Sequence, residues 1–292
     1  MYVKGCNPLA KTEKMSLCLC CGLQRAAITD VLLPCCGLVV HGMCLKTECP
    51  QCGDPLETTD ALYQKATDLI SRNKYHLQRG KLLPDDIEYV YTLHLEAAKR
   101  GHLQAQLRVY EAHSMGVIVE PNVEWAIHFL SLAADHSAHA KILLGDYYFD
   151  TDLARAQTAY YGAMQQFAFV TFKHKGMAQT CAKVFNRLGK CMRHKGDTKA
   201  SAYFLKAVEF DAQNADYHHD LGVQHAVDGD FDKAEREHRA CLHLNPKHAL
   251  AQYAVGFLLA KKGDKKAAMF FTRALRLGHF GAKKQLDKLN TP

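Results

Sequence analysis

The chain has 292 residues, 48% of them hydrophobic, and a formal net charge of +7 at pH 7, a composition that supports one large or two smaller folded domains and excludes a disordered chain. It contains no apolar run long enough to cross a bilayer, and its first residues lack the apolar segment of a secretory signal. These features predict a cytoplasmic or nuclear protein with no membrane partner.

After an N-terminal extension, residues 1–16, the segment 17–56 is rich in cysteine and holds eight of the chain's twelve. In a reducing compartment such a cluster predicts metal binding before disulfides. A spacing of two residues suits zinc, because a tight turn then brings two donors to one ion. We expect two zinc ions, held by four pairs of donors in closed structural sites without a catalytic residue. The pairs are Cys18 with Cys21, Cys35 with Cys36, His41 with Cys44, and Cys49 with Cys52.

The order of these pairs and the ending Cys49-Pro50-Gln51-Cys52 resemble a RING-type zinc finger. The resemblance implies a cross-brace, with site 1 made of Cys18, Cys21, His41 and Cys44, and site 2 made of Cys35, Cys36, Cys49 and Cys52. The second pair departs from the family pattern because its two thiols are adjacent. Site 2 therefore uses both of these thiols or only one.

Many RING domains are E3 ubiquitin ligases that dock a ubiquitin-conjugating enzyme on an apolar groove. Leu19 and Pro50 match two of the docking positions in that family. The aromatic residue expected between the third and fourth pairs is absent, and the single tryptophan, Trp125, lies far outside the segment. Two interpretations stay open, a RING-type E3 ubiquitin-protein ligase and a zinc module that is structural or binds protein.

Helical periodicity dominates from Ala61 onward, and residues 61–165 repeat with a spacing of thirty-six. Gly80 recurs as Gly116, and the pair Ala97-Ala98 recurs as Ala133-Ala134. These segments resemble Sel1-like repeats, which implies paired helices joined by glycine-containing turns.

Residues 176–278 repeat with a spacing near thirty-four and resemble tetratricopeptide (TPR) repeats, and residues 279–292 are expected to form a capping helix and a tail. Three sets of positions align along these repeats: Leu188-Gly189, Leu221-Gly222 and Val255-Gly256; Gly196, Gly229 and Gly263; and Ala200, Ala234 and Ala268. The fold class is therefore mostly α, an α-solenoid of Sel1-like and TPR-like helix pairs preceded by a small zinc-stabilised RING-like module.

An α-solenoid of this kind implies a groove that holds a protein or peptide. His219, Val223, Tyr253 and Phe257 are expected to face that groove. Some TPR proteins clamp a ligand's terminal carboxylate with Lys and Asn, but the corresponding helix here carries Asn186 and Lys190 in swapped order. The order disfavours such a clamp.

The positive charge is concentrated in residues 176–292, which hold 20 Lys or Arg against 12 Asp or Glu. This excess of positive charge indicates either a solvated helix face or, as the more specific interpretation, a surface that binds an acidic partner or RNA. Nucleic acid is the least favoured partner, because no aromatic residues alternate with the basic ones. The candidate basic edge consists of Lys261, Lys262, Lys265, Lys266, Lys283 and Lys284.

Several other histidines, cysteines and aromatic residues predict packing and not chemistry. We expect the pairs Cys191 with His194 and His238 with Cys241 to be ordinary structural positions, and His218-His219 to lie on a solvated helix face. An aromatic stripe from Tyr147 to Phe172 predicts core packing between helix pairs, with an exposed aromatic groove for a peptide as the alternative. The chain as a whole is predicted to be an adaptor, with a non-enzymatic scaffold and an RNA-associated factor as alternatives.

Overall fold

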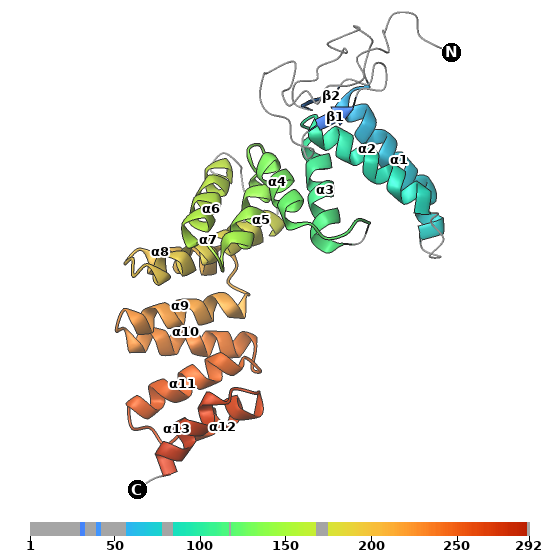
Figure 1. The fold of residues 1–292 in the computed structure, drawn as a ribbon. Helices are drawn as coiled ribbons and strands as arrows, with labels where there is room; N and C mark the ends of the chain where they lie inside the picture. The colour runs from blue at the N-terminus through green and yellow to red at the C-terminus, as the bar shows by residue number, and fades with distance from the viewer. Residues whose placement is uncertain are drawn as a thin grey trace, which may run out of the picture. The chain divides into compact units, whose positions relative to one another are not determined.

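The computed structural model describes residues 30–32, 39–41, 57–77, 84–116, 118–167 and 175–290, and in 30–32, 39–41, 72–77, 84–86, 175 and 290 it describes only the backbone. This part of the chain is almost entirely helical, with thirteen α-helices and two short strands (Figure 1). The chain divides into two compact units, Met1–Leu144 and Gly145–Pro292. The mostly α fold predicted from the sequence is confirmed for the described residues.

The first unit begins with two antiparallel strands, β1 (Asp30–Leu32) and β2 (Val39–His41), in which Asp30 pairs with His41. Its helices are α1 (Thr59–Leu77), α2 (Pro84–Lys99), α3 (Leu103–Met115), α4 (Val123–Ala134) and the first part of α5 (Ala138–Tyr148). Consecutive helices from α1 to α4 pack against one another. Small residues such as Ala97 and Ala105 are fully buried between them, beside Val109 and Phe129.

The loop between α3 and α4 requires a glycine. Gly116 ends α3 in the left-handed region with φ 64°, where residues with a side chain are strained. A Cβ added to Gly116 would also lie 2.6 Å from Cγ of Pro121. The side chain of Asn122 then caps α4 by accepting a hydrogen bond from the backbone N–H of Trp125 at 3.0 Å. Helix α4 therefore starts at a defined point after the glycine turn.

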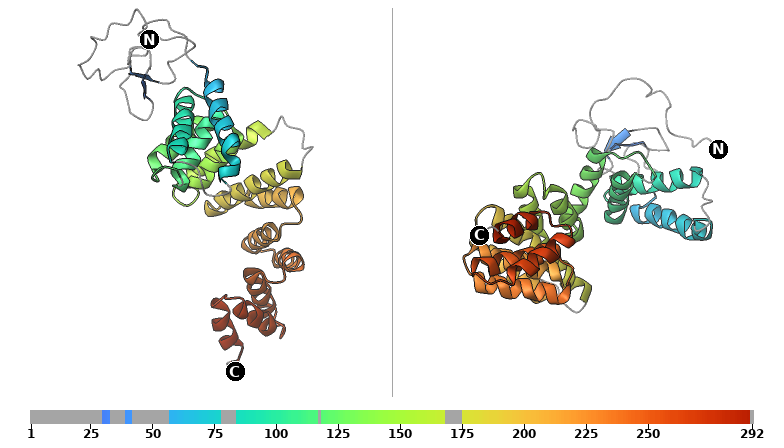
Figure 2. Two further views of the ribbon diagram at one scale, coloured as in Figure 1. Left: turned by 90° about the vertical axis from the view of Figure 1, so that its right-hand side faces the viewer. Right: turned by 90° about the horizontal axis from the view of Figure 1, so that it is seen from below.

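The second unit is a stack of antiparallel helix pairs. After the end of α5, its helices are α6 (Leu153–Phe167), α7 (Lys175–His194), α8 (Ala200–Phe210), α9 (Ala215–Val227), α10 (Phe231–Leu244), α11 (Ala249–Lys261), α12 (Ala267–Arg276) and α13 (Gly281–Asn290). Each helix from α6 to α13 packs on the next, and the orange and red helices lie side by side in both views of Figure 2.

A glycine on one helix of each pair faces a large ring on the other helix. A Cβ on any of these glycines would lie closer than 3.0 Å to that ring, a distance that a carbon contact does not reach. The repeated Leu-Gly motif therefore has a packing role, since only glycine leaves room for the ring. The facing pairs are Gly145 and Tyr160, Gly189 and Phe204, Gly222 and His238, and Gly256 and Phe271.

The repeated small residue on the second helix of each pair is buried, but the sequence alignment of its third copy was wrong. Ala200, Ala234 and Ala267 are each 0% exposed, and Ala268 is only half-buried. The buried alanine follows the turn glycine by five residues from Gly229 to Ala234, but by only four from Gly263 to Ala267. The equivalent alanine therefore falls at position 267 instead of 268.

The described part of the aromatic stripe packs only partly inside the second unit, and Tyr148, Phe149 and Tyr161 are half-buried. Tyr160 is fully buried and Phe167 is nearly so, although Tyr147 is 43% exposed. Phe169 and Phe172 lie outside the described residues. Among the helices described here, none combines the length and the apolar character that crossing a membrane requires.

Candidate functional site

A groove of about 480 Å³ lies in the second unit, between α9, α10, α11 and the turn that precedes α13. The four residues expected to face a groove all line it, which confirms that expectation. The complete lining is His219, Val223, Ala226, Val227, Phe231, His238, Leu250, Tyr253, Ala254, Phe257, Leu258 and His279.

Helical spacing explains why these residues share one surface. His219, Val223 and Val227 follow at intervals of four along α9, and such residues lie on one helix face. Three large apolar side chains of this groove are exposed: Val227 by 65%, and Leu250 and Phe257 by about half. Contiguous exposed apolar surface of this kind is typical of a site where a protein or ligand binds.

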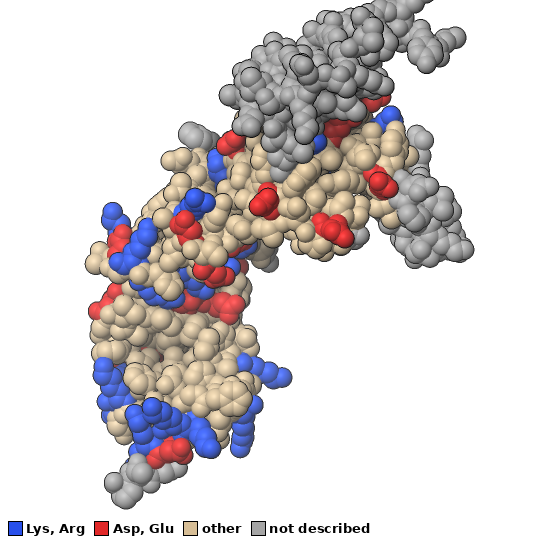
Figure 3. All heavy atoms as spheres, in the orientation of Figure 1, with Lys and Arg blue, Asp and Glu red and all other residues tan. Residues whose placement is uncertain are grey.

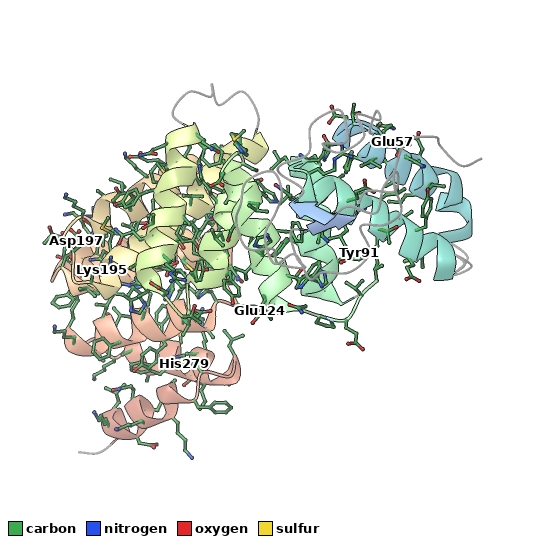
Figure 4. All side chains as sticks on the ribbon, turned by 45° about the horizontal axis from the view of Figure 1, so that its top comes forward. Glu57, Tyr91, Glu124, Lys195, Asp197 and His279 are labelled. Atoms are coloured by element: carbon green, nitrogen blue, oxygen red, sulfur yellow. The ribbon has the colours of Figure 1, made fainter. Side chains whose placement is uncertain are left out.

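Three histidines line the groove, and each has an unpartnered nitrogen. The buried Nδ1 atoms of His219, His238 and His279 make no hydrogen bond in the described part of the chain. The rings of His219 and His238 lie 5.1 Å apart, and His279, labelled in Figure 4, stacks on Tyr253 at 4.2 Å. These nitrogens are buried below the surface of the groove, and nothing among the described residues pairs with them.

Burial keeps two of these imidazoles neutral. Burial, followed by the charge of nearby His248, lowers the pKa of His219 to about 4. Burial, with smaller effects of His219 and His248, lowers the pKa of His238 to about 3. At neutral pH each of these two rings can donate one hydrogen bond and accept another, but neither carries a charge.

The expectation that His218 and His219 form a solvated pair was wrong. Nδ1 of His218 is hydrogen-bonded to Oε2 of Glu237 at 2.7 Å, which raises the pKa of His218 despite its partial burial. His219 packs against His238 from α10 and against His248 at the start of α11. Helices α10 and α11 therefore cover the face of α9 that carries these two histidines, although its sequence alone suggests a solvated face.

The six lysines of the candidate basic edge differ in what they contact. All six are exposed, and Figure 3 shows basic side chains gathered at the C-terminal end of the second unit. Nζ of Lys262 pairs with Asp232 at 2.8 Å and with Glu235 at 2.9 Å. Nζ of Lys261 lies 3.6 Å from the centre of the Phe231 ring, at the edge of the groove. No ion pair with another described residue is made by Lys261, Lys265, Lys266, Lys283 or Lys284.

Helix α7 shows why a terminal-carboxylate clamp is absent. Nδ2 of Asn186 donates to the carboxylate of Asp220 at 2.8 Å, and Nζ of Lys190 lies 2.8 Å from the same carboxylate. Arg193 donates to the backbone oxygen of Asp220 at 3.4 Å. The chain's own aspartate on α9 therefore occupies the donors that a ligand carboxylate would need.

The carboxylate of Asp146 contacts two basic side chains of α7. Asp146 accepts a hydrogen bond of 2.7 Å from the hydroxyl of Tyr160, and Lys183 and Arg187 approach it at 2.6 Å and 3.3 Å. Burial and this hydrogen bond raise the pKa of Tyr160 well above its ordinary value. Four basic side chains of α7 are thus paired with two carboxylates of the same unit.

The predicted zinc ligands cannot be placed as a site. His41 is the last residue of β2, and only its backbone is described. Leu19, Pro50 and the other predicted ligands lie outside the described residues; those ligands are Cys18, Cys21, Cys35, Cys36, Cys44, Cys49 and Cys52.

The histidines and cysteines of the repeats do not assemble a metal site. Within the ranges that the structure describes, no three His, Cys, Asp or Glu side chains are grouped so that they could hold a metal ion. Cys191, His238 and Cys241 are buried in the second unit, in agreement with the structural role predicted for them.

No family model matches the chain, and no curated protein matches it. Solved structures do resemble it. PilF of Pseudomonas aeruginosa is 14% identical with a TM-score of 0.56, and the match covers 78% of this chain and 99% of that one. YrrB, described as a TPR protein with an unusual peptide-binding site, is 20% identical with a TM-score of 0.53, and the match covers 68% of this chain and 97% of that one. The similarity shows the fold, a TPR-like helical-repeat solenoid.

Proposed function

We propose that this protein is an adaptor whose helical repeats hold a peptide segment of a protein partner. The observation that carries the proposal is the groove of the second unit, in which the apolar side chains of Val227, Leu250 and Phe257 stay exposed. A folded chain gains by burying such side chains, so their exposure favours a surface kept free for a ligand. The structural similarity to YrrB, a TPR protein with a peptide-binding site, supports the same function.

Cross-linking can test whether peptides bind in this groove. Peptides selected from a random library on the full chain would be presented to variants that carry a benzophenone amino acid at one position. A benzophenone at Leu250, which is 51% exposed in the groove, is expected to cross-link to the peptides. The same group at Leu205, which is 49% exposed on α8 and outside the groove lining, is the control. Equal cross-linking at both positions, or no selected peptide, would reject the proposal.

The adaptor is proposed to carry two zinc ions in the segment 17–56. The chemistry of the donors supports zinc, since seven thiols and one imidazole match the ligands that zinc prefers. Such ions would stabilise a segment too short to build a hydrophobic core of its own. Metal analysis of the purified full chain should give two zinc ions per molecule, and Cys44→Ser should reduce that content. A wild-type content of one ion would contradict the cross-brace and indicate a single site.

If the zinc module also recruits a ubiquitin-conjugating enzyme, the adaptor is a RING-type E3 ubiquitin ligase. The helical repeats would then bind the substrate protein. Leu19 and Pro50, at positions that match the docking surface of RING ligases, favour it. An in vitro ubiquitination assay with a panel of conjugating enzymes tests it. Chain formation that Leu19→Ala abolishes while the zinc content is unchanged would support the ligase. If no conjugating enzyme supports chain formation, the non-enzymatic scaffold is the correct alternative.

A further inference from the structure

The groove of the second unit has a neutral interior and a cationic edge, and this difference indicates what kind of peptide it binds. Its interior is lined by apolar side chains and three histidines and holds no Asp, Glu, Lys or Arg. Its edge carries Lys261, held against the ring of Phe231. This inference rests on the proposed function, because both concern peptide binding in the same groove.

The interior of the groove is lined by apolar side chains and histidines, with no carboxylate, lysine or arginine among them. His238 is only 1% exposed, and its Nδ1 is buried against Gly222 of α9, so this nitrogen is not available to a ligand. The Nδ1 atoms of His219 and His279 are likewise buried. A charged side chain would be disfavoured here, because the site holds no opposite charge among its lining residues.

The edge offers one positive charge that the fold does not neutralise. Lys261 and Lys262 are adjacent in sequence, but only Lys262 is paired with carboxylates among the residues described. The ring of Phe231 positions the ammonium of Lys261 at the mouth of the groove, since a cation is attracted to an aromatic face. The remaining unpaired lysines of the basic edge add to the positive potential at this end of the unit.

Helix geometry gives the distance between the apolar wall and the cation. Phe257 and Lys261 are four residues apart on α11, so they share a face and are separated by about 6 Å along the helix. An extended peptide advances about 3.3 Å per residue. A ligand residue that contacts Phe257 and a ligand residue that contacts Lys261 are therefore about two positions apart.

We propose that the groove binds an acidic peptide in extended form. A bulky apolar side chain of this peptide packs between Val223 and Phe257, and an Asp or Glu about two positions away pairs with Lys261. A ligand held by its terminal carboxylate on α7 does not fit, because Asp220 already occupies Asn186 and Lys190.

Peptide selection on the full chain tests this specificity. Peptides enriched from a random library would be synthesised, and their affinities would be measured by fluorescence polarisation. We expect a bulky apolar residue with an Asp or Glu about two positions away. Replacing that acid by its amide, or Lys261→Glu in the protein, should weaken binding about threefold to tenfold, the effect of one solvated ion pair lost or reversed. Lys199→Glu makes the same charge change at an exposed position of the α7–α8 turn and should leave the affinity unchanged.

The outcomes separate this inference from the proposed function. Peptides that need Phe257 but show no acidic preference, and bind the Lys261→Glu variant normally, would overturn the acidic specificity and leave a peptide groove. Peptides whose affinity is unaffected by Phe257→Ala, or no enriched peptide at all, would reject the groove function itself. A single-stranded oligonucleotide that binds more tightly than the peptides, and loses that affinity on Lys261→Glu, would assign the cationic edge to nucleic acid and overturn the proposal.

Discussion

The side chain of Asn186 on α7 donates a hydrogen bond of 2.8 Å to the carboxylate of Asp220 on α9. Both residues are more than nine-tenths buried, so this polar contact lies inside the stack of helices. Lys190 and Arg193 reach the same aspartate from α7. Asp220 therefore joins two consecutive repeats and also removes the donors that could have held a ligand carboxylate.

Replacing this aspartate should weaken the joint between α7 and α9. Asp220→Asn removes the negative charge that Lys190 and Arg193 face, and we expect a loss of about 2 kcal/mol in the free energy of unfolding. Urea denaturation followed by circular dichroism measures it. Asp232→Asn is the control, because Asp232 is 83% exposed and its pair with Lys262 is solvated, so a much smaller change is expected. Equal losses in the two variants would contradict a structural role for Asp220.

The glycine of each helix pair can be tested with one methyl group. In Gly256→Ala the new Cβ would meet the buried ring of Phe271 at 2.9 Å, and the resulting strain should destabilise the protein by about 1–3 kcal/mol. Gly176→Ala is the matched control, since Gly176 is also helical and has no atom within 4 Å of the new Cβ. That control should be neutral or slightly stabilising, because alanine favours the helix. Both values come from thermal or chemical denaturation, and a harmless Gly256→Ala would refute the close packing.

Burial of His238 makes stability depend on pH. Its pKa is about 3 in the folded chain and near 6.5 when unfolded, so below about pH 6.5 the unfolded state binds more protons and stability falls as the pH decreases. From about pH 7 to about pH 5 this single histidine should cost about 2 kcal/mol.

His238→Phe should flatten that dependence. Phe204 and Phe271 occupy the corresponding place in the neighbouring repeats, so the variant is expected to fold. Unfolding in urea at a series of pH values gives the slope, and His243→Gln, on the exposed part of α10, controls for the removal of a histidine from this helix. A His238→Phe variant with the wild-type slope would show that other groups cause the dependence.

The cysteines of the repeats should resist alkylation while the chain is folded. Burial, with nearby Asp216 and Asp220, raises the pKa of Cys241 to about 12, and burial also raises the pKa of Cys181 and Cys191. Because the thiolate is the reactive form, iodoacetamide should modify these three residues only after unfolding in urea. Peptide mass spectrometry of native and denatured samples measures the difference. Rapid native labelling of Cys241 would contradict its burial.

Much of the groove could be predicted because it depends on periodic positions. Residues four apart on a helix share a face, and the repeat spacing places equivalent faces next to one another. The sequence therefore predicts His219, Val223, Tyr253 and Phe257 as groove residues. Phe231, Leu250 and His279 were missed. His279 lies in the turn between α12 and α13, where helical periodicity does not apply.

The sequence by itself determined the helical repeats, the recurring positions of their glycines and four residues of the groove. These features follow from local spacing and residue size, which a single chain displays directly. Only the tertiary structure decided that Lys261 is available while Lys262 is paired, and that Asn186 and Lys190 are already held by Asp220. Ion pairs depend on the approach of side chains from helices about one repeat apart, and burial depends on what covers a face. Neither ion pairing nor burial can therefore be predicted from the helical periodicity of the sequence.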